Sequence, residues 1–132
     1  MRGKTRRGAK SKVLDKAYMI DIDGVICNHI PNEFPERMIT AKELPGAREW
    51  INSRYNAGDY ICFFTARLEE HRKVTEEWLR EHRFRYHEII FGKPRGGNYH
   101  YIDGKHVRAT TFRGRFTPLV SESHGIEVFE DS

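Results

Sequence analysis

The chain has 132 residues, enough for one domain with its own hydrophobic core and too few for a second. A hydrophobic content of 38% and a mean hydropathy of -0.73 indicate a folded globule with a well-solvated surface, and exclude a disordered chain. No apolar run approaches the roughly 20 residues of a membrane span, and no apolar segment follows the basic N-terminus, so we expect a soluble, cytoplasmic protein.

Basic residues are concentrated at the N-terminus. Residues 1–12 hold six of the 23 lysines and arginines and no acid, which leaves 17 basic against 19 acidic residues in the rest of the chain. We predict a disordered basic tail over 1–12 and a single catalytic domain over 13–132. The tail is compatible with nucleic-acid contact, but the body of the chain is not basic, and we favour no nucleic-acid partner.

Short apolar runs alternate with helical patterns along the chain. The predicted strands are residues 17–20, 60–64, 88–91 and 99–102, and the helical patterns fill residues 46–58 and 69–83. This alternation predicts an α/β, Rossmann-like three-layer fold with a mostly parallel central sheet and no separate cap domain.

Each helical pattern has one apolar face. The expected inward residues of the first helix are Ala47, Trp50, Ile51 and Tyr55, with Gly58 as its stop, and those of the second are Val74, Thr75, Trp78 and Leu79. On the outer face of the second helix, the spacing predicts i,i+4 ion pairs of Glu69 with Lys73 and of Glu76 with Arg80.

Polar residues follow the predicted strands. They are Asp21, Thr65, Lys93 and Asp103. In open α/β sheets the ligand crevice lies outside the carboxyl ends of the strands. With right-handed crossovers the fourth strand returns to the far side of the first, so we expect Asp21 and Asp103 to be neighbours.

Asp21 and Asp23 stand two positions apart on an extended segment, so both side chains point to one side, and Gly24 permits a sharp turn behind them. Together with Asp103 they would repel one another unless a cation lay among them. A hard, oxygen-preferring ion such as Mg²⁺ suits an all-carboxylate site. We therefore predict Asp21, Asp23 and Asp103 as metal ligands.

These residue types form a set for phosphoryl transfer. Asp21 would attack phosphorus to give an aspartyl phosphate, and Asp23 would protonate the leaving oxygen and later activate water. Thr65 would hold a phosphoryl oxygen, and Lys93 would balance charge. The sequence predicts a phosphatase on this basis.

Four motifs resemble those of the haloacid dehalogenase (HAD) superfamily. They are "IDIDGVI", "YICFFTAR", "FGKP" and "YHYIDGKHV", in the same order and spacing across residues 17–108. The resemblance implies a Mg²⁺-dependent aspartyl-phosphate mechanism on a Rossmann-like fold, with the roles given above. Within the superfamily the chain is most similar to small, capless phosphatases of capsular or lipopolysaccharide sugar biosynthesis, which implies a phosphorylated sugar as substrate. Many relatives carry a second acid in the fourth motif, where this chain has Gly104 followed by Lys105, so we expect weaker Mg²⁺ affinity.

The gaps between the motifs bear on the substrate. Residues 28–45 could form a lid loop, but no gap holds a cap domain, so the cleft should be open and a homo-oligomer could supply a lid. Arg67, Asn98 and His29 are candidate substrate contacts, and Arg67 could equally be a surface residue at the start of a helix.

Other functions remain open. A nucleic-acid 3′-phosphatase suits an open cleft and a basic tail. A non-enzymatic phospho-receiver module also gathers acids, Thr and Lys, but it carries its phosphoacceptor on the third strand, where "EIIFG" offers no Asp. A DxD glycosyltransferase needs a longer chain.

Overall fold

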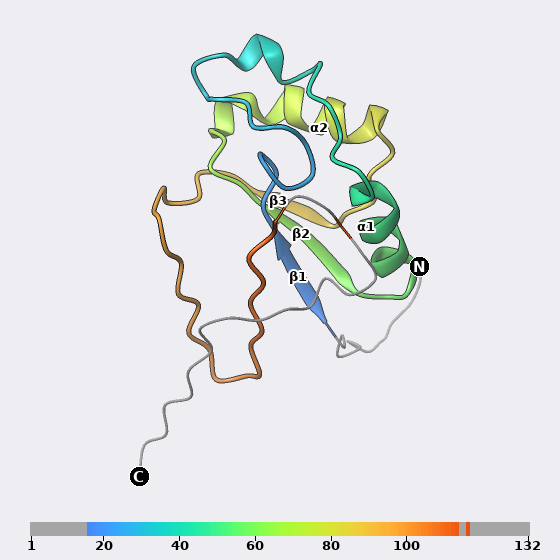
Figure 1. Ribbon diagram of the computed structural model, residues 1–132, viewed down its shortest axis with the longest axis vertical. Coiled ribbons are helices and arrows are strands. Elements are labelled where there is room, and N and C mark those ends of the chain that lie inside the picture. The colour runs from blue at the N-terminus through green and yellow to red at the C-terminus, as the bar shows by residue number, and fades with distance from the viewer. Residues whose placement is uncertain (1–15, 114–115, 117–132) are drawn as a thin grey trace.

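The chain folds around a small parallel sheet. The computed structural model describes residues 16–113 and 116, so the predicted tail 1–12 lies outside the described residues. The strands are β1 (Ala17–Ile20), β2 (Tyr60–Phe64) and β3 (Glu88–Ile90). The helices are α1 (Ala47–Asn56) and α2 (Arg72–Glu81), with short 3-10 turns η1 (Pro35–Arg37) and η2 (Glu69–His71) (Figure 1). No helix among the described residues is long and apolar enough to cross a membrane.

The three strands are parallel and lie in the order β1-β2-β3. Ile20 pairs with Phe63, and Phe63 pairs with Ile89, so the three carboxyl ends lie at one edge of the sheet. This confirms the predicted α/β class and open parallel sheet, which are compatible with a Rossmann-like fold. The first two strands have the predicted bounds, and the third ends one residue early.

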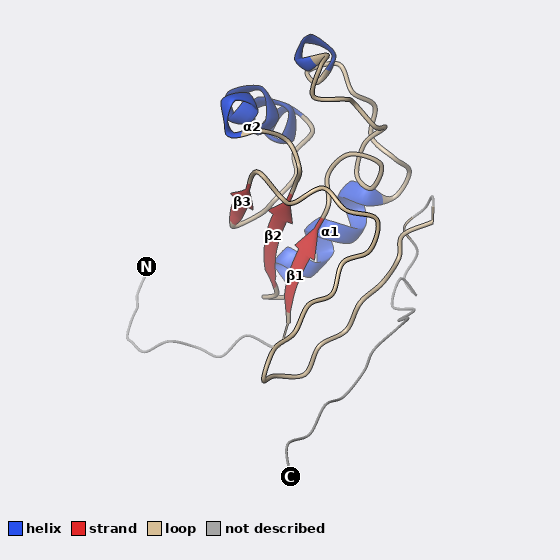
Figure 2. Cartoon of the chain, turned by 90° about the vertical axis from the view of Figure 1, so that its left-hand side faces the viewer, coloured by secondary structure: helices blue, strands red, loops and turns tan. Residues whose placement is uncertain are grey.

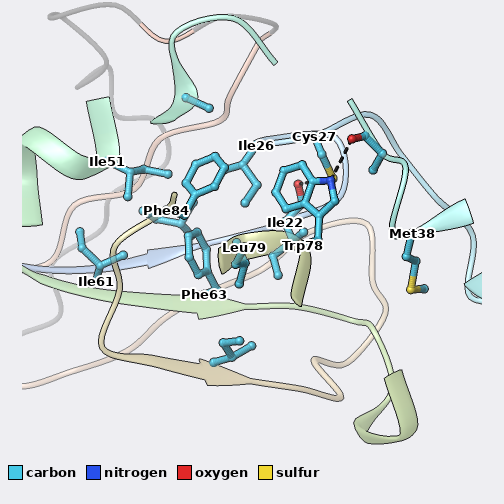
Figure 3. Packing of buried hydrophobic residues seen from close by; sticks show 14 of the residues in the cluster. Ile22, Ile26, Cys27, Met38, Ile51, Ile61, Phe63, Trp78, Leu79 and Phe84 are labelled. Atoms are coloured by element: carbon cyan, nitrogen blue, oxygen red, sulfur yellow. Dashed lines mark hydrogen bonds between the residues drawn. The ribbon is translucent and has the colours of Figure 1, made fainter. Parts of the chain in front are cut away.

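The core lies on one face of the sheet. Side chains of Ile20, Ile61, Phe63 and Ile89 project from this face into a cluster with residues of both helices (Figure 3). Two successive right-handed crossovers that advance in the same direction place both helices on the same face. The predicted inner faces of the helices are confirmed, because Ala47, Ile51, Thr75, Trp78 and Leu79 are buried and Trp50, Tyr55 and Val74 are half-buried.

The opposite face carries Met19, Cys62 and Ile90, and no described helix covers it. Met19 is 54% exposed. The predicted third layer requires the chain to cross back to the far side of β1, and it depends on the predicted fourth strand. That strand is absent from the described residues.

The prediction of a strand at residues 99–102 is wrong. Residues 91–113 form an extended loop that leaves β3 and turns back without pairing to β1 (Figures 1 and 2). Its aromatic side chains find partners within the loop: the Tyr99 hydroxyl donates to the Pro94 carbonyl at 2.6 Å, and the Tyr101 hydroxyl donates to Asp103 at 2.7 Å. No helix precedes this segment to cover its apolar side, and Ile102 remains 84% exposed.

Residues 28–45 do not form a free lid. Ile30, Met38 and Ala41 are buried in the main core, and the indole N–H of Trp78 donates to the Ala41 carbonyl at 2.8 Å. The segment is therefore fixed against α2 (Figure 3).

Surface ion pairs at the start of α2 also differ from the prediction, because Arg72 bonds both Glu69 and Glu76 and so replaces the predicted partners of those acids.

Candidate active site

Asp21 lies directly after β1, at the carboxyl edge of the sheet. Its Oδ1 accepts the Ile22 backbone N–H at 2.8 Å and faces the Lys93 ammonium at 3.7 Å. Its Oδ2 has no partner among the described residues, and the side chain is 39% exposed. Burial raises the pKa of Asp21 above its usual range, and the Lys93 charge opposes that rise. The site therefore holds a half-buried carboxylate with one open oxygen beside a cation.

Backbone hydrogen bonds between two strand ends fix the position of Lys93. The Thr65 N–H donates to Ile90, and the Lys93 N–H donates back to the Thr65 carbonyl, both at 2.9 Å. This ladder extends the β2–β3 pairing past the strands. The Lys93 side chain then passes the Phe64 ring, whose centroid is 5.6 Å from Nζ, and reaches Asp21 across β2.

Asp23 is bound by a buried arginine. The Arg67 Nε and Nη2 groups donate to its two carboxylate oxygens, each at 2.9 Å, and the Ile30 N–H adds a bond at 3.2 Å. Such a two-pronged pair fixes both the charge and the orientation of the carboxylate. In this arrangement both carboxylate oxygens of Asp23 accept hydrogen bonds from Arg67.

Arg67 is only 1% exposed. The interpretation as a surface residue at a helix start is therefore wrong, and the side chain leaves almost no exposed surface for a contact with substrate. Its Nη1 donates to the Thr75 hydroxyl of α2 at 3.0 Å, so one guanidinium joins the loop after β1, the loop after β2 and the helix. In the sequence, the helical spacing of Thr75 predicts a core residue, and nothing in the sequence indicates its hydrogen bond with Arg67.

Thr65 is completely buried, and its hydroxyl accepts the Arg67 backbone N–H at 3.1 Å. Its position at the end of β2 agrees with the sequence analysis, but its side chain turns the loop and has no exposed surface. Cys27 is also buried near this network, and burial raises the pKa of its thiol to about 12, so it is not a thiolate nucleophile.

A shallow groove of about 420 Å³ adjoins Lys93. Its lining residues are Asn32, Glu33, Ala66, Leu68, Gly92, Lys93 and Arg95. The Asn32 side chain donates to the Ala66 carbonyl at 3.2 Å and so ties the 28–45 segment to the rim. Two cations and one acid give the groove the polarity of a site for an anionic, hydroxyl-bearing molecule. No sequence motif singled out Asn32 or Glu33.

Three other candidate residues lie apart from this site. Asp103 is fully exposed in the 91–113 loop, where the Tyr101 hydroxyl holds the pKa of its carboxyl below the usual range. Asn98 and His29 are also exposed, and neither forms a side-chain bond among the described residues. The predicted proximity of Asp103 to Asp21 is therefore wrong for this structure, because the strand that would carry it is missing.

A divalent cation needs more oxygen ligands than the described residues bring together here. Mg²⁺ takes several oxygen ligands in octahedral geometry. The described residues bring no group of three His, Cys, Asp or Glu side chains together. Asp21 faces Lys93 and Asp23 faces Arg67, so each carboxylate already has a cationic partner. The arrangement does not fit the predicted three-carboxylate site, and no step below is derived through a metal.

Comparisons with known proteins add little to this geometry. No family model matches the chain, and none of the curated proteins matches it either. Among solved structures, the crystal structure of an MCSG target from Vibrio cholerae is similar, with 24% identity and a TM-score of 0.45, over 70% of this chain and 83% of that chain. A likeness at this level says nothing about function. The described fold and site define an α/β protein with an open parallel sheet and a carboxylate–lysine pair at its carboxyl edge.

Proposed function

We propose that the protein is a phosphohydrolase that cleaves a phosphate monoester, with a phosphorylated sugar as its preferred substrate, through an aspartyl phosphate on Asp21. The main support is the open Oδ2 of Asp21 beside Lys93, at the sheet edge where α/β proteins bind ligands. The groove next to Lys93 offers room for the rest of the substrate. The resemblance of the four sequence motifs to the HAD superfamily adds independent support.

The chemistry follows from the charges. The Lys93 ammonium would neutralise a phosphoryl oxygen while Oδ2 of Asp21 forms a bond to phosphorus and the bond to the leaving oxygen breaks. Water would then attack phosphorus, release inorganic phosphate and regenerate the carboxylate. The leaving oxygen needs a proton in the first step, and Asp23 can supply one only after it separates from Arg67.

Mg²⁺ belongs to the proposal through the acidic residues of the sequence and the superfamily resemblance, and the geometry adds no support for it. Chelation tests it separately: EDTA should abolish phosphate release, and added Mg²⁺ should restore it. If Asp103→Asn needs the same Mg²⁺ concentration for half-maximal activity, Asp103 is not a metal ligand. If it needs a tenfold higher concentration, Asp103 belongs to the metal site.

The test of the reaction is phosphate release by the purified full chain. Sugar phosphates, an aryl phosphate, nucleotides and an oligonucleotide with a 3′-phosphate are compared at equal concentration. Asp21→Asn should lower turnover at least about 1,000-fold, because it removes the nucleophile. Glu49→Gln, an equivalent change at an exposed position of α1, should leave turnover unchanged. Turnover that survives in Asp21→Asn would refute the covalent mechanism, and a preference for the oligonucleotide would replace the sugar substrate.

A further inference from the structure

The two helices end in the same backbone motif with different residues. In α1 the Gly58 N–H bonds the Tyr55 carbonyl and the Asp59 N–H bonds the Arg54 carbonyl; in α2 the Arg83 N–H bonds Arg80 and the Phe84 N–H bonds Leu79. This is the Schellman ending, whose first residue beyond the cap is left-handed and usually glycine. Gly58 has a φ of 100°, whereas Arg83 has a φ of 63° and is the one non-glycine residue with positive φ among those described. The chain thus keeps an arginine where its other helix has glycine.

Arg83 belongs to the rim of a hollow of about 670 Å³, within the size range of small-molecule sites. The hollow lies between the last turns of α2 and the segment leading to β3. Its lining residues are Glu76, Arg80, Arg83, Phe84, Arg85 and Tyr86. None of the three arginines forms an ion pair within the described part of the chain, and the only acid, Glu76, is already bonded to Arg72 at 3.1 Å. The hollow is therefore lined by three arginines that have no ion-pair partner among the described residues.

The segment after α2 that carries Arg83 and Arg85 is hydrogen-bonded to α1. The side-chain amide of Asn52 on α1 donates to the Arg83 carbonyl and accepts the Arg85 N–H, each at 2.8 Å. The Arg85 guanidinium lies over the Tyr55 ring at 4.6 Å and donates to Asn56 at 3.0 Å. Attraction to the negative end of the α2 dipole explains a cation at Arg80, in the last turn, but it does not require one at a left-handed position or beyond it.

We propose that this hollow is an anion site for a ligand with two or more neighbouring phosphate groups. A guanidinium matches a phosphate with two parallel hydrogen bonds, and Arg80 at the end of α2 together with Arg83 and Arg85 just beyond it can engage more than one phosphate. Backbone strain in a non-glycine residue is typical of positions kept for function. The shared chemistry has two sources, a free polyphosphate such as a nucleoside triphosphate and the backbone of single-stranded nucleic acid. The site lies beyond the amino end of β3 and does not depend on the proposed phosphohydrolase.

Binding of inorganic tripolyphosphate and of a fluorescent 12-residue oligothymidylate is measured on the full chain in EDTA. Arg83→Gly and Arg85→Gln should each weaken binding at least tenfold, while Arg83→Gly keeps or raises the thermal midpoint because it relieves the backbone. Lys73→Gln, which removes a charge from an exposed position of α2, and Lys93→Met, which disables the proposed catalytic edge, should leave this binding unchanged.

The two ligands distinguish the source. Oligothymidylate that binds more tightly than tripolyphosphate and is displaced by it assigns the site to nucleic acid, and the reverse order assigns it to a free polyphosphate. The inference is overturned if Arg83→Gly binds as the unmodified protein does, if Lys73→Gln weakens binding equally, or if neither ligand binds below 1 mM, on the order of the weakest functional ligand affinities.

Discussion

Asp21 is a carboxyl group whose ionised form the fold makes less favourable. Burial disfavours its ionised form most, and Asp23 nearby repels it, while Lys93 at 3.7 Å and the Ile22 backbone N–H favour it. An acid in such a place is typical of a functional position, because a purely structural role would be filled more favourably by an uncharged residue. This reasoning leads to a prediction about stability that does not depend on any substrate.

The pH dependence of stability should identify Asp21. Its folded pKa lies above the ordinary 3.8, so the folded protein binds more protons than the unfolded chain between 3.8 and the raised value. The free energy of unfolding therefore falls as pH rises through that window. Asp21→Asn should stabilise the protein against urea at about pH 7. It should have no such effect below pH 3.8, where the Asp21 carboxyl is neutral in both the folded and the unfolded state.

Asp103 provides the opposite control. Its folded pKa lies below 3.8, so it contributes stability above that pH, and this contribution is lost as pH falls through the lowered value. Asp103→Asn should therefore destabilise the protein slightly at neutral pH. If Asp21→Asn and Asp103→Asn shift the urea midpoint in the same direction at about pH 7, the electrostatic description of Asp21 is wrong.

Arg67 joins three segments that are distant in the sequence. Residue patterns could predict that Asp23 follows a strand and that Thr75 faces the core, but not that one guanidinium satisfies both. Helical spacing reports which side of α2 is inward, and it carries no information on which loop residue reaches that side. The sequence therefore predicted the positions of Asp21, Thr65 and Lys93 at strand ends and missed the pairing that determines what Asp23 can do.

Removing this guanidinium should be costly. Arg67→Met leaves the half-buried Asp23 carboxylate with the Ile30 N–H but without its cationic partner, and loss of one member of a buried pair costs about 3–5 kcal/mol. The matched variant is Arg72→Met in the first turn of α2, where the arginine bonds Glu69 and Glu76 at the surface and the loss should be much smaller than for Arg67→Met. Urea unfolding measures both. Equal losses would mean that Arg67 does not hold Asp23 in solution.

The C-terminal ends of α1 and α2 provide a second pair of variants whose stabilities can be compared. A left-handed backbone costs an L-residue roughly 1–2 kcal/mol, while glycine's extra freedom in the unfolded chain costs roughly 0.5–1 kcal/mol. Gly58→Ala should therefore destabilise the protein by about 1 kcal/mol, and Arg83→Gly should stabilise it by up to about 1 kcal/mol. Urea midpoints of the two variants decide this. A destabilised Arg83→Gly would show that the guanidinium contributes to folding as well as to the hollow.

Strand and helix positions were predictable because each depends on the local spacing of hydrophobic residues. The bounds of β1 and β2 match the apolar runs, and both helices bury the residues that helical spacing selects. The segment 99–102, wrongly predicted as a strand, has a similar apolar composition, but three of its large side chains are exposed to solvent: Tyr99, Tyr101 and Ile102. Pairing of this segment to β1 depends on which other parts of the chain pack on its two faces. The local spacing of hydrophobic residues carries no information about such long-range contacts.

The missing strand changes the overall architecture, because without it the sheet has helices on one face and none among the described residues on the other. On the face that carries the helices Ile61 is completely buried; on the other face Met19 of the edge strand is 54% exposed, while Cys62 of the central strand is 1% exposed. Ile61→Ala should cost about 2–5 kcal/mol, the range for a fully buried residue, whereas Met19→Ala should cost less than about 0.5 kcal/mol. Urea unfolding at two protein concentrations provides the measurement. A Met19→Ala loss as large as that of Ile61→Ala would show that this face is covered in solution, and a dependence on protein concentration would show that a second copy covers it.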